Sequence, residues 1–139
     1  MNYSQEYAAL ILRVSLGIMF IAHGLLKIMV FTLPGAAGFF ESVGFPGWMA
    51  YVVAYAEVGG GLLLISGFAV RAVSIALTPI LLGATYVHLG AGWVFSNEGG
   101  GWEYPAFLTV ATVVQALLGP GKFALRLPAK QPQTSAASV

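Results

Sequence analysis

The hydrophobic residues of this chain gather into long stretches, separated by short connections rich in glycine and proline. Because an α-helix rises about 1.5 Å per residue, roughly 20 residues are needed to cross the apolar core of a membrane, which is about 30 Å thick. Each long stretch is predicted to form one spanning helix, and together they cover residues 8–31, 48–68, 72–95 and 104–118. The pattern therefore predicts an all-α fold, an integral membrane four-helix bundle.

The connections agree with this division into helices. Between the first two stretches, residues 36–43 are predicted to form a short interfacial helix or a re-entrant segment. Only residues 67–71 separate the second and third stretches, which predicts a tight antiparallel pair. Residues 1–127 are interpreted as one transmembrane domain, and the small, polar residues 128–139 as a disordered cytoplasmic tail.

Composition and charge favour lipid as the surroundings of the chain. Charged residues make up 8% and hydrophobic residues 58% of the chain, whereas an ordinary soluble domain is about 25% charged. So few charges cannot cover a soluble globular protein, and the lipid bilayer is the expected partner. The net charge of +1 gives no basic surface for nucleic acid. Because cysteine is absent, a Cys-ligated zinc or an iron–sulfur cluster is excluded, and redox chemistry would need a bound cofactor or a partner. No metal-binding residue is assigned.

The cations outside the spans predict how the bundle is oriented, because positively charged connections remain in the cytoplasm. Arg71 lies between the second and third stretches, and three further cations, Lys122, Arg126 and Lys130, follow the fourth. An even number of spans places all of them on the side of the N-terminus. The sequence therefore predicts that both the N- and C-termini are cytoplasmic.

Ionisable residues inside the predicted spans are the candidate functional residues, because each is costly to place in a membrane. At about 100° per residue, Arg13, His23 and Lys27 fall on one face of the first helix. Glu57 lies near the middle of the second. No catalytic residue is assigned. The candidates for a ligand-binding site or a buried polar network are His23, Lys27, Glu57, His88, Glu103 and Arg13.

Each candidate also has a structural interpretation. His23 and Lys27 could pair with acidic residues of neighbouring helices, and Lys27 could instead extend to the membrane interface. Arg13 could anchor the cytoplasmic side. For Glu57 a functional role is favoured, because a carboxylate at mid-membrane costs the most free energy to bury. His23 and His88 could be axial haem ligands, but two histidines in a four-helix protein are weak evidence, and haem is not expected.

Several short motifs are spread over nearly the whole chain. The first helix carries R-x-x-x-G and H-G-x-x-K, the second carries E-x-x-G-G, and the loop before the last contains G-G-W-E-Y-P. In combination they closely resemble the DoxX family of small bacterial inner-membrane proteins, which implies a multi-pass inner-membrane location. That family is named for a subunit of a thiosulfate:quinone oxidoreductase, and other members are linked to oxidoreductase or thiol-stress complexes. The six candidate residues match its polar motif positions.

The resemblance implies a quinone-associated or accessory subunit of membrane redox or thiol-stress metabolism. His23, Lys27 and Glu57 would then hold a quinone-like head group in an apolar pocket, and electrons would pass through the quinone or a partner oxidoreductase. One alternative is a small proton- or solute-coupled transporter that uses Glu57. Another is a structural partner without catalytic activity. Self-association into a homo-oligomer is compatible with a small bundle that exposes much surface to lipid.

Overall fold

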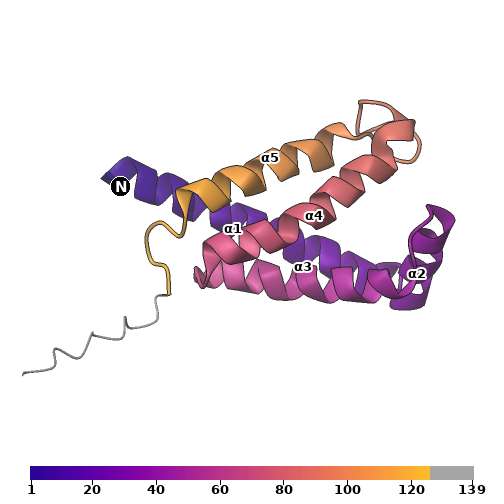
Figure 1. Ribbon diagram of the computed structural model, residues 1–139, viewed down its shortest axis with the longest axis horizontal. Coiled ribbons are helices and arrows are strands. Elements are labelled where there is room, and N and C mark those ends of the chain that lie inside the picture. The colour runs from indigo at the N-terminus through magenta and orange to yellow at the C-terminus, as the bar shows by residue number, and fades with distance from the viewer. Residues whose placement is uncertain (126–139) are drawn as a thin grey trace, which may run out of the picture.

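The computed structural model describes residues 1–125, and every regular element in this range is helical (Figure 1). The elements are α1 (Tyr3–Leu25), the π-helix Leu26–Val30, α2 (Leu33–Ser42), α3 (Trp48–Ser66), α4 (Val70–His88), the 3-10 helix Leu89–Ala91 and α5 (Glu103–Leu118). The predicted all-α class is confirmed for this range. The predicted tail, 128–139, and the cations Arg126 and Lys130 lie outside the described residues.

Three helical segments are long and apolar enough to cross a membrane: Tyr3–Val30, Trp48–Ser66 and Val70–Ala91. Helix α5 is apolar but shorter, with 16 residues. Large apolar side chains are exposed on the outer faces of these helices, among them Ile18, Val52, Leu62, Ile75, Leu82, Phe107 and Leu117. An apolar surface of this extent is suited to contact with lipid tails.

Capping residues set where the first helices begin. Helix α1 starts at Tyr3, ahead of the expected residue 8, because Asn2 and Gln5 form a capping box in front of it. In the connection to α3, the Thr32 side chain accepts a hydrogen bond from the backbone N–H of Gly35 at 3.3 Å, and a proline occupies the first turn. This connection therefore contains a helix of its own, α2.

The third apolar stretch leaves the helical conformation earlier than its hydropathy suggests. Helix α4 ends at His88, the 3-10 turn ends at Ala91, and Gly92 has a φ of 84°. A residue with such a positive φ ends an α-helix, and glycine is the residue that adopts this conformation without strain. Beyond it, the side chain of Asn97 donates to the carbonyl oxygen of Ala91 at 2.9 Å. The last residues of this stretch thus belong to the loop before α5.

Helices α1 and α3 make the closest helix pair in the described part of the chain. Small residues permit this approach. A Cβ added to Gly17 would lie 2.7 Å from the carbonyl oxygen of Gly61, and one added to Gly24 would lie 2.8 Å from that of Ala54. Close backbone contact through small residues is a common way for membrane helices to associate. The crossing places α1 against the buried face of α3, which also carries Glu57.

The helices form two pairs, α1 with α3 and α4 with α5. Near the α3–α4 turn, an apolar core joins the pairs; it consists of Leu16, Phe20, Leu64, Val70, Val73, Leu77 and Leu81. Towards the opposite end the pairs diverge, and α2 lies beside the beginning of α3 there (Figure 1). The π-helical turn and the end of α4 lie towards this diverging end (Figure 1).

Candidate functional site

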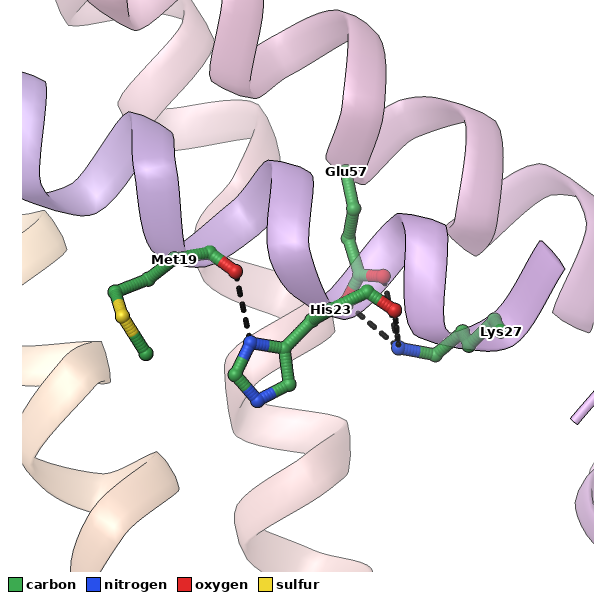
Figure 2. Close-up of polar contacts among 4 residues, drawn as sticks. All are labelled: Met19, His23, Lys27 and Glu57. Atoms are coloured by element: carbon green, nitrogen blue, oxygen red, sulfur yellow. Dashed lines mark hydrogen bonds and ion pairs between the residues drawn. The ribbon is translucent and has the colours of Figure 1, made fainter. Parts of the chain in front are cut away.

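Lys27 and Glu57 form an ion pair between the end of the first helical segment and α3 (Figure 2). The Nζ atom of Lys27 lies 2.8 Å from Oε2 and 3.0 Å from Oε1 of Glu57. The side chain of Glu57 is 6% exposed and that of Lys27 is 20% exposed. Each charge would be costly alone inside a membrane span, and the pairing compensates both.

Lys27 lies in the π-helical turn that follows α1. This turn covers Leu26–Val30, and the backbone N–H of Phe31 donates to the carbonyl oxygen of Leu26 at 3.0 Å. A π-turn holds one more residue than an α-turn, so it rotates the side chains that follow around the helix axis. Turns of this kind are frequent at functional sites. Here the widened turn contains the residue that pairs with Glu57.

His23 lies one helical turn before Lys27. Its Nδ1 is 2.8 Å from the backbone oxygen of Met19 (Figure 2), and because a carbonyl oxygen can only accept, Nδ1 donates this bond. The ammonium group of Lys27 also donates a long hydrogen bond, 3.5 Å, to the backbone oxygen of His23. The His23 ring stacks on Tyr104 of α5, with ring centroids 5.9 Å apart. His23 therefore links α1 to α5.

These residues border a cavity of about 1040 Å³ whose wall includes residues of α1, α2, α3, α4, α5 and the loop before α5. Most of the lining side chains are apolar or aromatic. On α4, Nδ1 of His88 donates to the carbonyl oxygen of Ala84 at 2.7 Å. The polar side chains that line the cavity are His23, Lys27, Glu57, His88 and Tyr104. Four of the six residues selected from the sequence thus border one cavity.

The chemistry of the cavity suits an organic molecule. A mainly apolar wall with a few convergent polar groups is typical of sites for cofactors and small ligands. Among residues 1–125, no group of three His or Glu side chains is arranged to hold a metal ion.

Arg13, another candidate from the sequence, lies outside this cavity. It is only 1% exposed. Its guanidinium group donates to the backbone oxygens of Leu64 at 3.0 Å and Ile65 at 2.6 Å, near the end of α3, and to that of Lys122 at 2.8 Å. Carbonyl groups at a helix end lack partners within the helix. Arg13 therefore connects the end of α3 with the segment that follows α5 through hydrogen bonds to both.

Glu103, the sixth candidate, begins α5 and also lies outside the cavity. Its Oε1 accepts a hydrogen bond from the backbone N–H of Phe95 at 2.9 Å. Two backbone bonds close the same loop, from Trp102 N–H to Gly92 at 3.1 Å and from Glu103 N–H to Trp93 at 3.2 Å. Glu103 therefore stabilises the loop that forms part of the cavity wall.

Three polar residues of α5 were not selected from the sequence. Tyr104 lines the cavity, and Thr112 and Gln115 are fully buried. The side-chain amide of Gln115 donates to the backbone oxygen of Gly119 at 2.7 Å. The signal that could have identified them is an uncharged polar group in an apolar stretch, since such a group also needs a partner inside a membrane protein.

Known proteins resemble this chain over most of its length. "Putative oxidoreductase CatD" of Bacillus subtilis (strain 168) is 38% identical over 126 residues, which cover 90% of this chain and 89% of that protein. "Inner membrane protein YqjF" of Escherichia coli (strain K12) is 29% identical over 130 residues, which cover 90% of this chain and 94% of that protein. No solved structure matches the chain.

The family model named DoxX matches residues 8–90, more than half of the chain. This stretch includes most of α1 and all of α3 and α4, and with them His23, Lys27, Glu57 and His88. The predicted family is confirmed. Three helices long enough to span a membrane and a relative named as an inner membrane protein confirm the predicted location. The chain therefore belongs to the DoxX family and is a multi-pass protein of the bacterial inner membrane.

Proposed function

We propose that this protein is a four-helix membrane bundle that binds a quinone and acts as a quinone-associated or accessory subunit in membrane redox or thiol-stress metabolism. The observation that carries the proposal is a mainly apolar cavity whose lining includes His23, Lys27 and Glu57. A quinone has a planar polar head and a long apolar tail, so it suits such a site. The cavity, of about 1040 Å³, is as large as the upper range of ligand pockets, about 1,000 Å³.

The residues of the chain would hold and orient the head group. His23 and Tyr104 offer hydrogen-bonding groups on stacked rings, and Lys27 and Glu57 place a fixed ion pair beside them. A bound quinone would supply the electron-carrying chemistry that these side chains lack. Because the chain has no cysteine, the electron donor would be a partner. The name of the Bacillus relative supports a place in an oxidoreductase system.

Helix α5 would be the fourth crossing of the bundle. It packs along α4 and ends before Gly119, where an added Cβ would lie 2.9 Å from Nε of Arg71. Arg71 lies in the first turn of α4, so α5 reaches from one end of α4 to the other. Its 16 residues span about 24 Å, which is less than the thickness of the apolar core of a bilayer, about 30 Å. Local thinning of the bilayer can accommodate this difference. With four crossings, both termini would lie in the cytoplasm.

Ligand binding to the purified protein in mild detergent tests the proposal. Short-chain ubiquinone and menaquinone analogues should bind saturably to the unaltered chain. Glu57→Gln and His23→Ala should each weaken binding by about tenfold, or roughly 1.4 kcal/mol. The first change leaves the Lys27 charge in the wall without its partner, and the second removes the ring that stacks on Tyr104 at the edge of the cavity. Isothermal titration calorimetry would measure these affinities.

Glu103→Gln is the matched control for this experiment. It makes the same chemical change as Glu57→Gln, but at a carboxylate outside the cavity whose replacement can still accept the bond from Phe95. We expect this variant to bind like the unaltered protein. Absence of binding to the unaltered protein, or equal losses in the Glu57 and Glu103 variants, would refute the proposed site.

A further inference from the structure

The two histidines that line the cavity are fixed in the same tautomer. In each, Nδ1 donates to the backbone oxygen four residues earlier: Met19 for His23 at 2.8 Å and Ala84 for His88 at 2.7 Å. A neutral imidazole carries one proton. With that proton on Nδ1, the Nε2 atom of each ring bears a lone pair and can only accept a hydrogen bond.

Neither Nε2 atom has a hydrogen-bond partner among residues 1–125, and both rings border the cavity. In Figure 2, Nε2 of His23 points away from the Met19 carbonyl and from the Lys27–Glu57 pair. His88 stands on α4 beside the loop, where a Cβ added to Gly100 would lie 3.7 Å from its Nε2. The cavity therefore carries two acceptor atoms, contributed by different helix pairs.

The other polar side chains of the wall offer few free hydrogen-bond donors. Lys27 has three ammonium protons, and its contacts are both carboxylate oxygens of Glu57 and the backbone oxygen of His23. Its donors are thus occupied. The Tyr104 hydroxyl, which can donate or accept, is the other polar group of the wall. The polar side chains of the wall consequently offer a ligand more acceptors than donors.

We propose that this cavity binds a head group that donates hydrogen bonds, and so prefers the reduced, dihydroxy form of a quinone over the oxidised form. The oxidised ring presents carbonyl oxygens, which only accept, whereas each phenolic hydroxyl of the quinol can donate to Nε2 of His23 or His88. This inference rests on the proposed function, and it adds the redox form that the site selects.

A comparison of three ligands on the intact protein tests this preference: a decyl ubiquinol, the matching quinone, and the quinol dimethyl ether, which has no hydroxyl proton. Affinities would be measured by calorimetry in detergent under nitrogen, at one pH for all three ligands. We expect the quinol to bind about fivefold or more tighter than the quinone and the ether, the effect of one net hydrogen bond or more. The ether is more apolar than the quinol, so hydrophobic partition alone would favour the ether instead.

Two variants assign the preference to the histidines. His23→Phe and His88→Phe keep a planar ring but remove the acceptor, and each should reduce the ratio of quinol to quinone affinity towards one. Tyr86→Phe is the control, because Tyr86 is 66% exposed on α4 and should keep the ratio unchanged. The comparison of the three ligands on the unaltered protein does not depend on whether a variant folds.

The outcomes separate the two proposals. Equal or tighter binding of the quinone, or an ether that binds as tightly as the quinol, overturns the preference and leaves quinone binding in place. A ratio unchanged in both folded histidine variants also overturns it. If none of the three ligands binds, the proposed function itself fails.

Discussion

At the level of single residues, the charges of Lys27 and Glu57 depend on each other. The ammonium group contacts both carboxylate oxygens at 2.8 and 3.0 Å, and no other ion pair joins two long helices within the described range. Removal of one partner would leave the other charge buried without compensation. Removal of both would leave a neutral cavity wall. The cost of a single substitution therefore comes mainly from the group that remains.

We expect Glu57→Gln and Lys27→Met each to lower the free energy of unfolding by about 1–3 kcal/mol, somewhat less than for a fully buried pair. The reason for the smaller value is that the Lys27 side chain is 20% exposed. The double variant should lose less than the sum of the single losses, by about 1 kcal/mol or more. Unfolding with SDS in mixed micelles, followed by circular dichroism, would measure all four proteins. Strictly additive losses would contradict the coupling.

Helical periodicity predicted one part of this arrangement. His23 and Lys27 are one turn apart, so the sequence alone places them on one face of a helix. The π-turn that contains Lys27 had no such signal in the sequence. Tyr104 was missed because its approach to His23 depends on how α5 lies against α1. The partners of Arg13 are backbone oxygens, which any residue carries.

At the level of helices, the α1–α3 crossing fixes the wall that carries the ion pair. Gly17 and Gly61 face each other there, and an added Cβ on either would lie within 2.7 Å of the backbone oxygen of the other. The obstacle is backbone rather than a flexible side chain. Even one methyl group therefore forces the two helices apart. A shift of α3 would also move Glu57 relative to Lys27.

Gly61→Ala tests the crossing. We expect it to lower the free energy of unfolding by about 1–3 kcal/mol, the usual cost of overpacking, and to weaken ligand binding in the cavity. The matched control is Gly59→Ala on the exposed face of α3, where an added Cβ has no atom within 4 Å. That variant should be neutral or slightly stabilising, since alanine favours helix by up to about 1 kcal/mol. Equal stability of the two variants would argue against close backbone contact.

Hydropathy located the long helices because burial in lipid requires a continuous apolar stretch. Their ends were less predictable, since hydropathy carries no information about capping. The capping box at Asn2 extends α1 beyond the first apolar stretch. Gly92 ends the helical conformation before the third apolar stretch is over. Helix α5 is too short to count as a span by length alone. The proposed fourth crossing rests instead on the packing of α5 against α4.

For the whole molecule, the two ends of the bundle differ in charge. The N-terminus, the α3–α4 turn and the segment after α5 lie towards one end, opposite α2 and the loop before α5 (Figure 1). The first of these ends carries Arg71 and Lys122, and the backbone oxygen of Lys122 is bound by Arg13. The loop at the other end contains Glu98 and leads to Glu103. By the positive-inside rule, we expect the cationic end to face the cytoplasm.

Single cysteines can test this orientation directly, because the chain has none of its own. Three exposed positions suit the purpose: Ser4 in the first turn of α1, Ser96 in the loop before α5, and Leu125 after α5. We expect a membrane-impermeant maleimide added to intact cells to label Ser96→Cys and to leave Ser4→Cys and Leu125→Cys unlabelled. All three should react after the membrane is disrupted.

The pattern of labels also decides whether α5 crosses the membrane. Four crossings place residues 4 and 125 on the same side, whereas three crossings place them on opposite sides. Labelling of Leu125→Cys but not of Ser4→Cys in intact cells would therefore show that α5 does not cross. Labelling of both, with Ser96→Cys protected, would keep four crossings but invert the bundle. The expected pattern would place the diverging end of the bundle, where α2 and the loop before α5 meet the cavity wall, on the outer side of the membrane.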